Sequence, residues 1–152
     1  MELKKTLATV LFAMLMAVVL GTPARADTIN PYQEICQNIT PEEEDLLCKI
    51  LWAEANNQDM DGQRAVLEVI FNRVLSSSFP DSIELVLSQN GQFSTWKDRN
   101  KVEYTHVQLD ALQIVSEEVP VLPNTKYVFF DTRGKNGRDK IKIGNHWFGA
   151  EK

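Results

Sequence analysis

The sequence predicts a single, mainly helical α+β domain, and three observations carry that prediction. Two stretches, residues 41–56 and 63–75, place apolar side chains at the three- and four-residue steps of a helix. A third helical stretch covers residues 106–118 and stops before a proline. The C-terminal part reads "KYVFFDTRGKNGRDKIKIG", two β-rich runs that flank an Asn-Gly turn. We therefore expect a helical body followed by a small antiparallel β-hairpin.

The first 26 residues are predicted to be a cleavable signal peptide. Lys4 and Lys5 precede an uncharged run over residues 7–20, and residues 24–26 read Ala-Arg-Ala, the small-x-small pattern of a cleavage site. The uncharged run is shorter than the roughly 20 residues that span a bilayer. We therefore expect cleavage after residue 26, not a membrane anchor, and no stable membrane insertion of the mature chain.

The predicted mature chain is acidic. The leader carries a net charge of +2, so its removal takes the formal net charge from −5 to −7. An acidic chain is not expected to have nucleic acid or an anionic membrane as its main partner. The basic residues between Lys126 and Lys142 alternate with Asp and Gly, a pattern typical of a solvated hairpin and not of a nucleic-acid-binding patch.

Cys36 and Cys48 are the only cysteines. In an exported chain an even count favours one disulfide, here joining an N-terminal arm (residues 27–45) to the first helix. Two free buried thiols are one alternative. A metal site with His106 and His146 is another, but no C-x-x-C or H-x-x-x-H spacing supports it. We expect no metal and no cofactor.

The helix starts can be read from capping residues. Thr40 is a good N-cap, Pro41 suits the first helical position and Glu43 completes a capping box. Asp81 with Glu84 resembles a second capping box that opens a short helix through residue 87.

The remaining segments complete the expected fold. Residues 63–75 are apolar nearly all round and should form the buried central helix. Residues 88–104 are expected to be loop or short strands with interleaved aromatics. In the hairpin, residues 127–130 should pair with residues 140–143 across the turn at residues 136–137.

Glu54 is the anomaly of the first helix. Its spacing puts it on the same face as Leu47, Ile50 and Leu51, which should face the core. Burial favours the protonated form of a carboxyl group. An acid held neutral near pH 7 can protonate the leaving oxygen of a glycosidic bond. A buried glutamate hydrogen-bonded to a neighbouring helix fits the same pattern, so spacing alone leaves both interpretations open.

A series of short motifs, in a fixed order, surrounds Glu54. The motifs are Ala53-Glu54-Ala55, Gly62-Gln63, Asn72-Arg73, Phe79-Pro80, Gln92-Phe93-Ser94 and Gly144-Asn145-His146-Trp147-Phe148. Over residues 46–148 the chain resembles the cell-wall hydrolase family typified by spore-cortex-lytic enzymes (the SleB/CwlJ type). The resemblance makes residues 46–152 the expected catalytic domain.

The resemblance implies a lysozyme-like fold and cleavage of peptidoglycan between N-acetylmuramic acid and N-acetylglucosamine. It implies a lytic transglycosylase in which Glu54, the Glu of the A-E-A motif, is the catalytic acid. The muramic acid 6-hydroxyl is then the nucleophile, so no second carboxylate is required. A hydrolytic muramidase and a non-catalytic wall-binding protein that keeps the fold are the alternatives.

The motif Gln92-Phe93-Ser94 and the nearby Trp96 supply four candidate sugar-binding residues. Gln92 and Ser94 are expected to hydrogen-bond sugar hydroxyls or the N-acetyl group. Phe93 and Trp96 are expected to stack on a sugar face, and a core position is the alternative for Phe93.

Residues in the C-terminal part of the chain, and Arg73 on the central helix, have expected roles as well. Asn145 is expected to line the cleft, whereas His146 and Trp147 are expected to form a structural lock. Tyr127 and Phe129 are expected either in the cleft wall or on the core face of the sheet. Arg73 is expected to brace the end of its helix.

The expected protein is secreted, periplasmic or cell-wall associated, and its partner is the peptidoglycan glycan strand. We expect no separate wall-binding domain within this sequence, so that the catalytic domain grips glycan alone or with an accessory wall-binding protein. We expect a monomer. Val74 stands where relatives often carry a hydroxyl residue, which makes it a candidate position for a difference from them.

Overall fold

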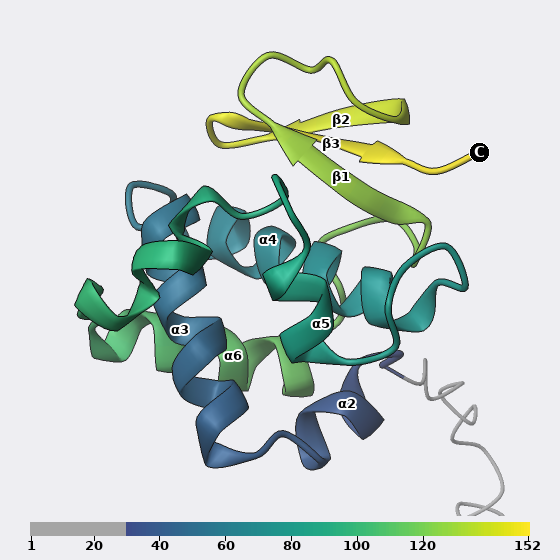
Figure 1. Ribbon diagram of the computed structural model, residues 1–152. Coiled ribbons are helices and arrows are strands. Elements are labelled where there is room, and N and C mark those ends of the chain that lie inside the picture. The colour runs from purple at the N-terminus through teal and green to yellow at the C-terminus, as the bar shows by residue number, and fades with distance from the viewer. Residues whose placement is uncertain (1–29) are drawn as a thin grey trace, which may run out of the picture.

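Helix α4 (Met60–Leu75) is the centre around which the described residues, 30–152, are arranged in this computed structural model (Figure 1). Every residue from Gly62 to Arg73 in α4 is buried, so the predicted central helix is confirmed. It starts earlier than expected because the side chain of Asp59 caps it, accepting a hydrogen bond from the Gly62 N–H at 2.9 Å. The predicted signal peptide lies outside the described residues.

The other helices surround α4. They are α2 (Gln33–Gln37), α3 (Pro41–Ala55), α5 (Ile83–Ser88), the 3₁₀ helix η1 (Ser94–Lys101) and α6 (His106–Glu117). The capping box of Thr40 and Glu43 at the start of α3 is present as predicted. None of the helices within residues 30–152 is both long enough and apolar enough to cross a membrane.

Three local expectations differ from the structure. Helix α5 is capped by Ser82, whose hydroxyl accepts a hydrogen bond from the Leu85 N–H, and not by Asp81. Helix α2 was not predicted, because its five residues are too few to show a period. The segment expected as loop or short strands contains η1.

The predicted two-stranded hairpin is wrong in its pairing. The structure has three antiparallel strands, β1 (Tyr127–Asp131), β2 (Arg138–Ile143) and β3 (His146–Ala150), in the order β1-β3-β2. The run taken for a C-terminal lock is therefore the central strand. Its apolar residues suit the middle of the sheet, whereas the charged β2 suits an edge.

The hairpin turn also differs from the prediction. The tight turn lies at Gly144-Asn145, between β2 and β3, and Gly144 has a positive φ of 57° there. Gly137 was expected in the tight turn of the hairpin, but it lies in the long connection from β1 to β2. A Cβ on Gly137 would meet Gly149 Cα at 2.7 Å, so the connection crosses close over β3.

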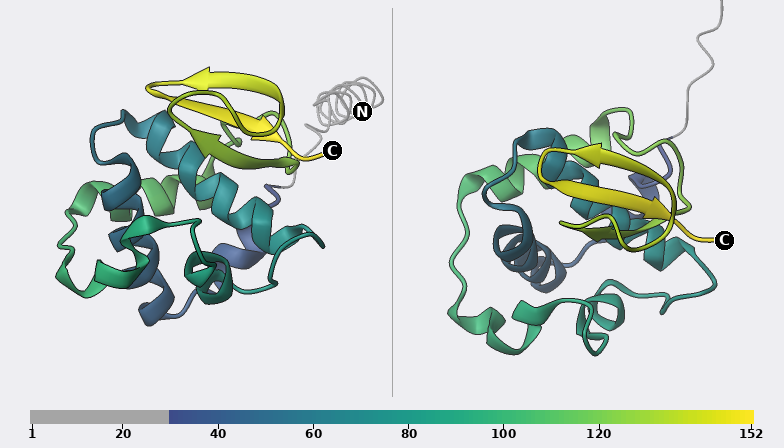
Figure 2. Two further views of the ribbon diagram at one scale, coloured as in Figure 1. Left: turned by 45° about the horizontal axis from the view of Figure 1, so that its top comes forward. Right: turned by 90° about the horizontal axis from the view of Figure 1, so that it is seen from above.

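The sheet packs over α4 (Figures 1 and 2). Asn72 Nδ2 donates to the Tyr127 carbonyl at 2.8 Å, and Arg73 Nε donates to the Val128 carbonyl at 2.7 Å. These two bonds tie α4 to β1 and agree with the bracing role expected for Arg73. They also set the height of the sheet above the helices.

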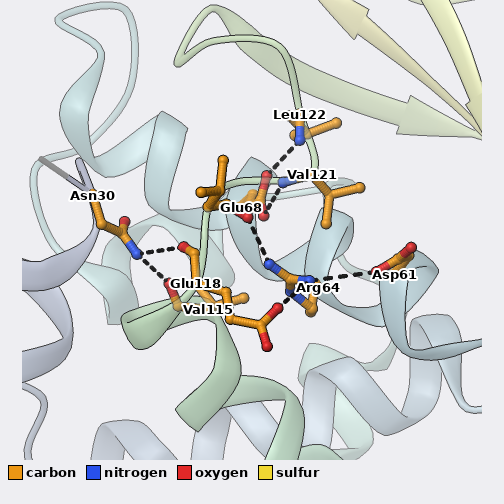
Figure 3. Close-up of polar contacts among 9 residues, drawn as sticks. Asn30, Asp61, Arg64, Glu68, Val115, Glu118, Val121 and Leu122 are labelled. Carbon is orange, nitrogen blue, oxygen red and sulfur yellow. Dashed lines mark hydrogen bonds and ion pairs between the residues drawn. The ribbon is translucent and has the colours of Figure 1, made fainter. Parts of the chain in front are cut away.

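A polar cluster anchors the N-terminal half of α4 (Figure 3). It is formed by Asp61, Arg64, Glu68 and Glu118 with the segment 119–122. Glu68 is completely buried, and its two oxygens accept the N–H groups of Val121 and Leu122, each at 2.8 Å. Burial raises the pKa of Glu68, opposed by these two bonds and by Arg64. Glu68 thus fixes the segment that follows α6.

Arg64 is the cation of this polar cluster. One Nη donates to the Val119 carbonyl at 2.8 Å. The other lies 3.1 Å from a Glu118 oxygen and 3.4 Å from an Asp61 oxygen. Arg64 therefore has two carboxylate partners and a backbone acceptor.

Cys36 and Cys48 are free thiols in the structure, so the predicted disulfide is not formed in it. This arrangement matches the alternative of two free thiols. Burial raises the pKa of Cys36 to about 11 and that of Cys48 to about 12, with nearby acidic residues adding to the shift at Cys48. Both thiols are therefore protonated at neutral pH.

Candidate active site

A cleft of about 350 Å³ lies where α3, the end of α4 and the sheet meet. Its walls come from five separate parts of the chain. The lining residues are Glu54, Arg73, Gly91, Gln92, Phe129, Phe130, Asp131, Thr132, Asn136 and His146. Two aromatic rings from β1 and a set of polar side chains therefore face one space, a composition suited to binding a sugar chain.

Glu54 is the penultimate residue of α3 and reaches the cleft half-buried. Burial raises the pKa of its carboxyl above the ordinary value, and no hydrogen bond or ion pair from residues 30–152 offsets that shift. Leu47, Ile50 and Leu51, on the same face, are fully buried, so the predicted position of Glu54 at the edge of the core is confirmed. Its carboxyl can hold a proton and release it into the cleft.

His146, the first residue of β3, is only 6% exposed and borders the same cleft. Its ring stands edge-on to Phe130, with the centroids 5.4 Å apart, and to Phe148 at 6.2 Å. Burial lowers the pKa of His146, and the charge of Asp131 opposes the shift. The imidazole is therefore neutral at neutral pH, and its Nδ1 has no hydrogen-bond partner in the described residues.

Asp131 ends β1 and is the second carboxylate of the cleft. Its oxygens accept the N–H groups of Arg133 at 2.6 Å, Lys135 at 3.0 Å and Asn136 at 3.1 Å. Desolvation alone would raise the pKa of Asp131, but these backbone hydrogen bonds outweigh it and hold the pKa below the ordinary value. Asp131 is therefore ionised, and its oxygens are occupied by the turn that it closes.

Arg73 brings a buried positive charge to the cleft wall. The residue is 4% exposed, and its guanidinium lies 5.2 Å from the ring centre of Phe79 and 5.4 Å from that of Phe93. Burial lowers the pKa of Arg73 to about 10, so it stays charged at neutral pH. Only its Nε has a hydrogen-bond partner within residues 30–152, the Val128 carbonyl.

Of the residues predicted to bind substrate, Gln92 lines the cleft. Phe93 is 3% exposed and packs against Phe130 at 6.3 Å, a placement that favours its core alternative. Tyr127 is 4% exposed and its hydroxyl donates to the Asp139 carbonyl at 2.6 Å, which favours the core face of the sheet.

Ser94, Trp96 and Asn145 are not among the residues that line the cleft. Ser94 is the exposed first residue of η1. Trp96 is half-buried, with the guanidinium of Arg99 4.0 Å from its ring centre. The backbone N–H of Asn145 donates to Gln58 at 2.8 Å, which ties the β2–β3 turn to the start of α4.

The sequence interpretation offered Phe129 of β1 as a possible wall residue, and Phe129 lines the cleft, but it missed the end of β1 and the connection after it. Phe130, Asp131, Thr132 and Asn136 all lie there. A signal was present, because Asp131 follows directly on the apolar run of β1, where a charged side chain begins a turn. No group of three or more His, Cys, Asp or Glu side chains in the described part of the chain is arranged to hold a metal ion.

Comparisons with known proteins agree with this architecture. The catalytic domain of the germination-specific lytic transglycosylase SleB from Bacillus anthracis matches with a TM-score of 0.62 and 21% identity, over 74% of this chain and 97% of that one. The catalytic domain of the Bacillus cereus SleB protein matches with a TM-score of 0.59 and 21% identity, over 74% and 93%. The predicted lysozyme-like α+β fold is thereby confirmed. A comparison with curated protein sequences found no match.

The sequence profile of the family described as Cell Wall Hydrolase matches residues 57–149. That span holds α4, the sheet except Ala150, and every cleft-lining residue except Glu54, which lies three residues before it. Because the matched span is more than half of the chain, the resemblance seen in the motifs is confirmed: the chain belongs to the Cell Wall Hydrolase family.

Proposed function

We propose that the protein is a peptidoglycan-cleaving lytic transglycosylase with Glu54 as its catalytic acid and base. The observation that carries the proposal is the state of Glu54, a half-buried carboxyl with a raised pKa and no partner within residues 30–152, on the wall of an aromatic-lined cleft. Membership of a cell-wall hydrolase family and the likeness in fold to SleB catalytic domains support the choice of substrate.

The reaction needs two proton transfers at Glu54. The protonated carboxyl first gives its proton to the glycosidic oxygen as the bond from muramic acid C1 to that oxygen breaks. The resulting carboxylate then takes the proton of the muramic acid 6-hydroxyl, whose oxygen bonds to C1. The products are a 1,6-anhydro end and a new hydroxyl end, and Glu54 is returned to its protonated form.

Asp131 supports transglycosylation over hydrolysis. It is the only other carboxylate among the lining residues, and hydrolysis through a second carboxylate would need it to activate water or to attack C1. Its two oxygens already accept hydrogen bonds from the turn at residues 133–136. A nucleophile supplied by the substrate requires no such group.

Peptidoglycan lies outside the cytoplasmic membrane, so this function requires export. The N-terminal segment predicted as a signal peptide would supply it, and a secreted, periplasmic or wall-associated location follows. The glycan strand is the proposed partner, bound in the cleft by Gln92 and the rings of β1.

The test is mass spectrometry of products from purified sacculi. Wild-type protein should release fragments with 1,6-anhydromuramic ends, and the Glu54→Gln variant should release none while its circular dichroism spectrum is unchanged. Glu42→Gln, an exposed glutamate on the same helix, is the matched control and should keep full activity.

Other products would contradict parts of the proposal. Fragments with reducing ends would show that the protein is a hydrolytic muramidase and not a lytic transglycosylase. Binding of sacculi with no cleavage, unchanged by Glu54→Gln, would make the protein a non-catalytic wall-binding member of the family.

A further inference from the structure

We propose that Arg73 binds a carboxylate of the glycan, the lactyl carboxylate that muramic acid exposes once its stem peptide has been removed. The preferred substrate would then be a peptide-free strand. This inference rests on the proposed function and adds the class of glycan that the cleft selects.

The first observation is that Arg73 is a buried cation without an anion. No carboxylate of the described residues lies within ion-pair distance, and among its donors only Nε has a protein acceptor. Leaving a buried charge uncompensated costs several kcal/mol in general. A fold keeps such a group where something else supplies the missing charge, and Arg73 lies on the wall of the cleft.

The second observation is that this arrangement is particular to one end of α4. Arg64, two and a half turns earlier on the same helix, is equally buried but has Asp61 and Glu118 as carboxylate partners (Figure 3). Asp131 is an ionised carboxylate that lines the same cleft as Arg73. Its oxygens, however, accept hydrogen bonds from the N–H groups of its own turn. The charge of Arg73 is therefore not neutralised by the neighbouring acid.

The third step is the chemistry of the substrate. N-acetylglucosamine is neutral, and muramic acid that carries a stem peptide joins it through a neutral amide. Muramic acid without its peptide carries a carboxylate on the lactyl group at C3, close to the glycosidic bond that Glu54 would cleave. Arg73 Nε is bonded to the Val128 carbonyl and Nη1 is buried from solvent, so the contact within reach is a charge-assisted hydrogen bond from Nη2 to a carboxylate oxygen. The guanidinium lies over the rings of Phe79 and Phe93, 5.2 and 5.4 Å from their centres, and these contacts limit its movement.

The experiment measures binding in the Glu54→Gln background, where turnover does not interfere. The two ligands are glycan strands freed of stem peptides by an amidase, and the same strands with their carboxylates converted to methylamides. The parent should bind the carboxylate strands about tenfold more tightly, since a charge-assisted pair contributes about 1.5–3 kcal/mol. Adding Arg73→Met should abolish that preference.

Arg64→Met is the matched control, and it should leave the preference intact. Equal weakening of both ligands by Arg73→Met would overturn the proposal and leave Arg73 as a brace for β1. If thermal unfolding shows that Arg73→Met does not fold, Arg73→Lys decides in its place. It should reduce the preference, and an unchanged preference would overturn the proposal.

Turnover of wild-type protein on sacculi separates this inference from the proposed function. Normal release of anhydro ends without any carboxylate preference overturns only the role of Arg73. A carboxylate preference in binding without any cleavage overturns only the catalytic role of Glu54.

Discussion

The polar cluster and the cleft each contain a buried arginine and a glutamate whose pKa is raised by burial, in opposite conditions. In the polar cluster, both oxygens of Glu68 accept backbone N–H groups and Arg64 faces two carboxylates. In the cleft, Glu54 has no partner in the described residues and Arg73 has a single carbonyl. Burial raises the pKa of both glutamates, so the pKa direction alone does not separate them.

The two regions differ in whether their polar side chains are already hydrogen-bonded within the protein or remain available to a ligand. Buried polar groups in folded proteins are almost always hydrogen-bonded, and those that are not call for an explanation. The polar cluster satisfies both oxygens of Glu68 and both Nη groups of Arg64, and only Arg64 Nε among its buried side-chain atoms has no partner in the described residues. It therefore stabilises the path of the chain after α6. The cleft leaves its groups for a ligand. Substitutions in the two regions should therefore change different quantities.

The largest effect is expected at Glu54. Glu54→Gln removes the transferable proton and should lower the rate of glycan cleavage by about 10²–10⁴-fold, the range of general acid–base catalysis. The melting temperature should stay the same or rise, because a group buried at a cost is replaced by a neutral one. Turbidity loss of sacculi and thermal unfolding measure the two quantities. Retained lysis would remove Glu54 from the mechanism.

Glu68→Gln should show the opposite pattern. Its amide nitrogen would face a backbone N–H that now lacks an acceptor, which should cost about 1–3 kcal/mol in the free energy of unfolding. Urea denaturation measures this loss. Activity per folded molecule should be unchanged, and a loss of activity without a loss of stability would give Glu68 a role in the cleft.

Arg64→Met should cost less, about 1 kcal/mol, because its carboxylate partners are well exposed and return to water. The loss should shrink as salt is added, since ion pairs near the surface are screened. Denaturation at low and high ionic strength tests this expectation. A loss that salt leaves unchanged would mean that packing of the buried stem dominates.

The pH dependence of stability and of cleavage distinguishes Glu54, with its raised pKa, from a solvated glutamate. The folded-state pKa of Glu54 is raised, so its contribution to stability is fully present below the unfolded value and is lost as pH rises through the folded value. Glu54→Gln should therefore match wild type at low pH and become relatively more stable as pH rises. Cleavage by the wild type should fall over the same rise, because the acid loses its proton. Thermal melts and rates across pH 4–9 measure both.

The smallest effect is expected at Val74, which lies on α4 next to Arg73 but is not among the lining residues. It packs half-buried against the core. Val74→Thr should cost about 1 kcal/mol or less and leave kcat/KM within twofold. A change in the products of sacculus digestion would show that the residue after Asn-Arg does tune the reaction.

The helices were predictable because their signals are local. The capping residues of α3 and the apolar surface of α4 lie within a few residues of what they determine. The sheet was not, since pairing Tyr127 with Ala150 joins residues far apart, and the apolar character of β3 was attributed to a lock.

The same distinction explains the outcome for the cleft. Glu54 was found because an acid on an apolar helix face is visible in one turn of sequence. Asp131 and His146 come together only through the strand order β1-β3-β2, so a prediction with β1 beside β2 could not bring them into one wall. Phe93 and Tyr127 were proposed as sugar contacts from residue type, and their burial depended on packing that the sequence does not display.

The central position of β3 has a consequence for the order of folding. Strands β1 and β2 precede β3 in the sequence, yet neither has a partner in the sheet until β3 lies between them. The helical body can form from local contacts, which are fast, whereas this sheet depends on contacts between distant residues. We expect the cleft to be completed after the helices, so a folding intermediate would possess Glu54 in its helix and still lack the surface against which a glycan is held.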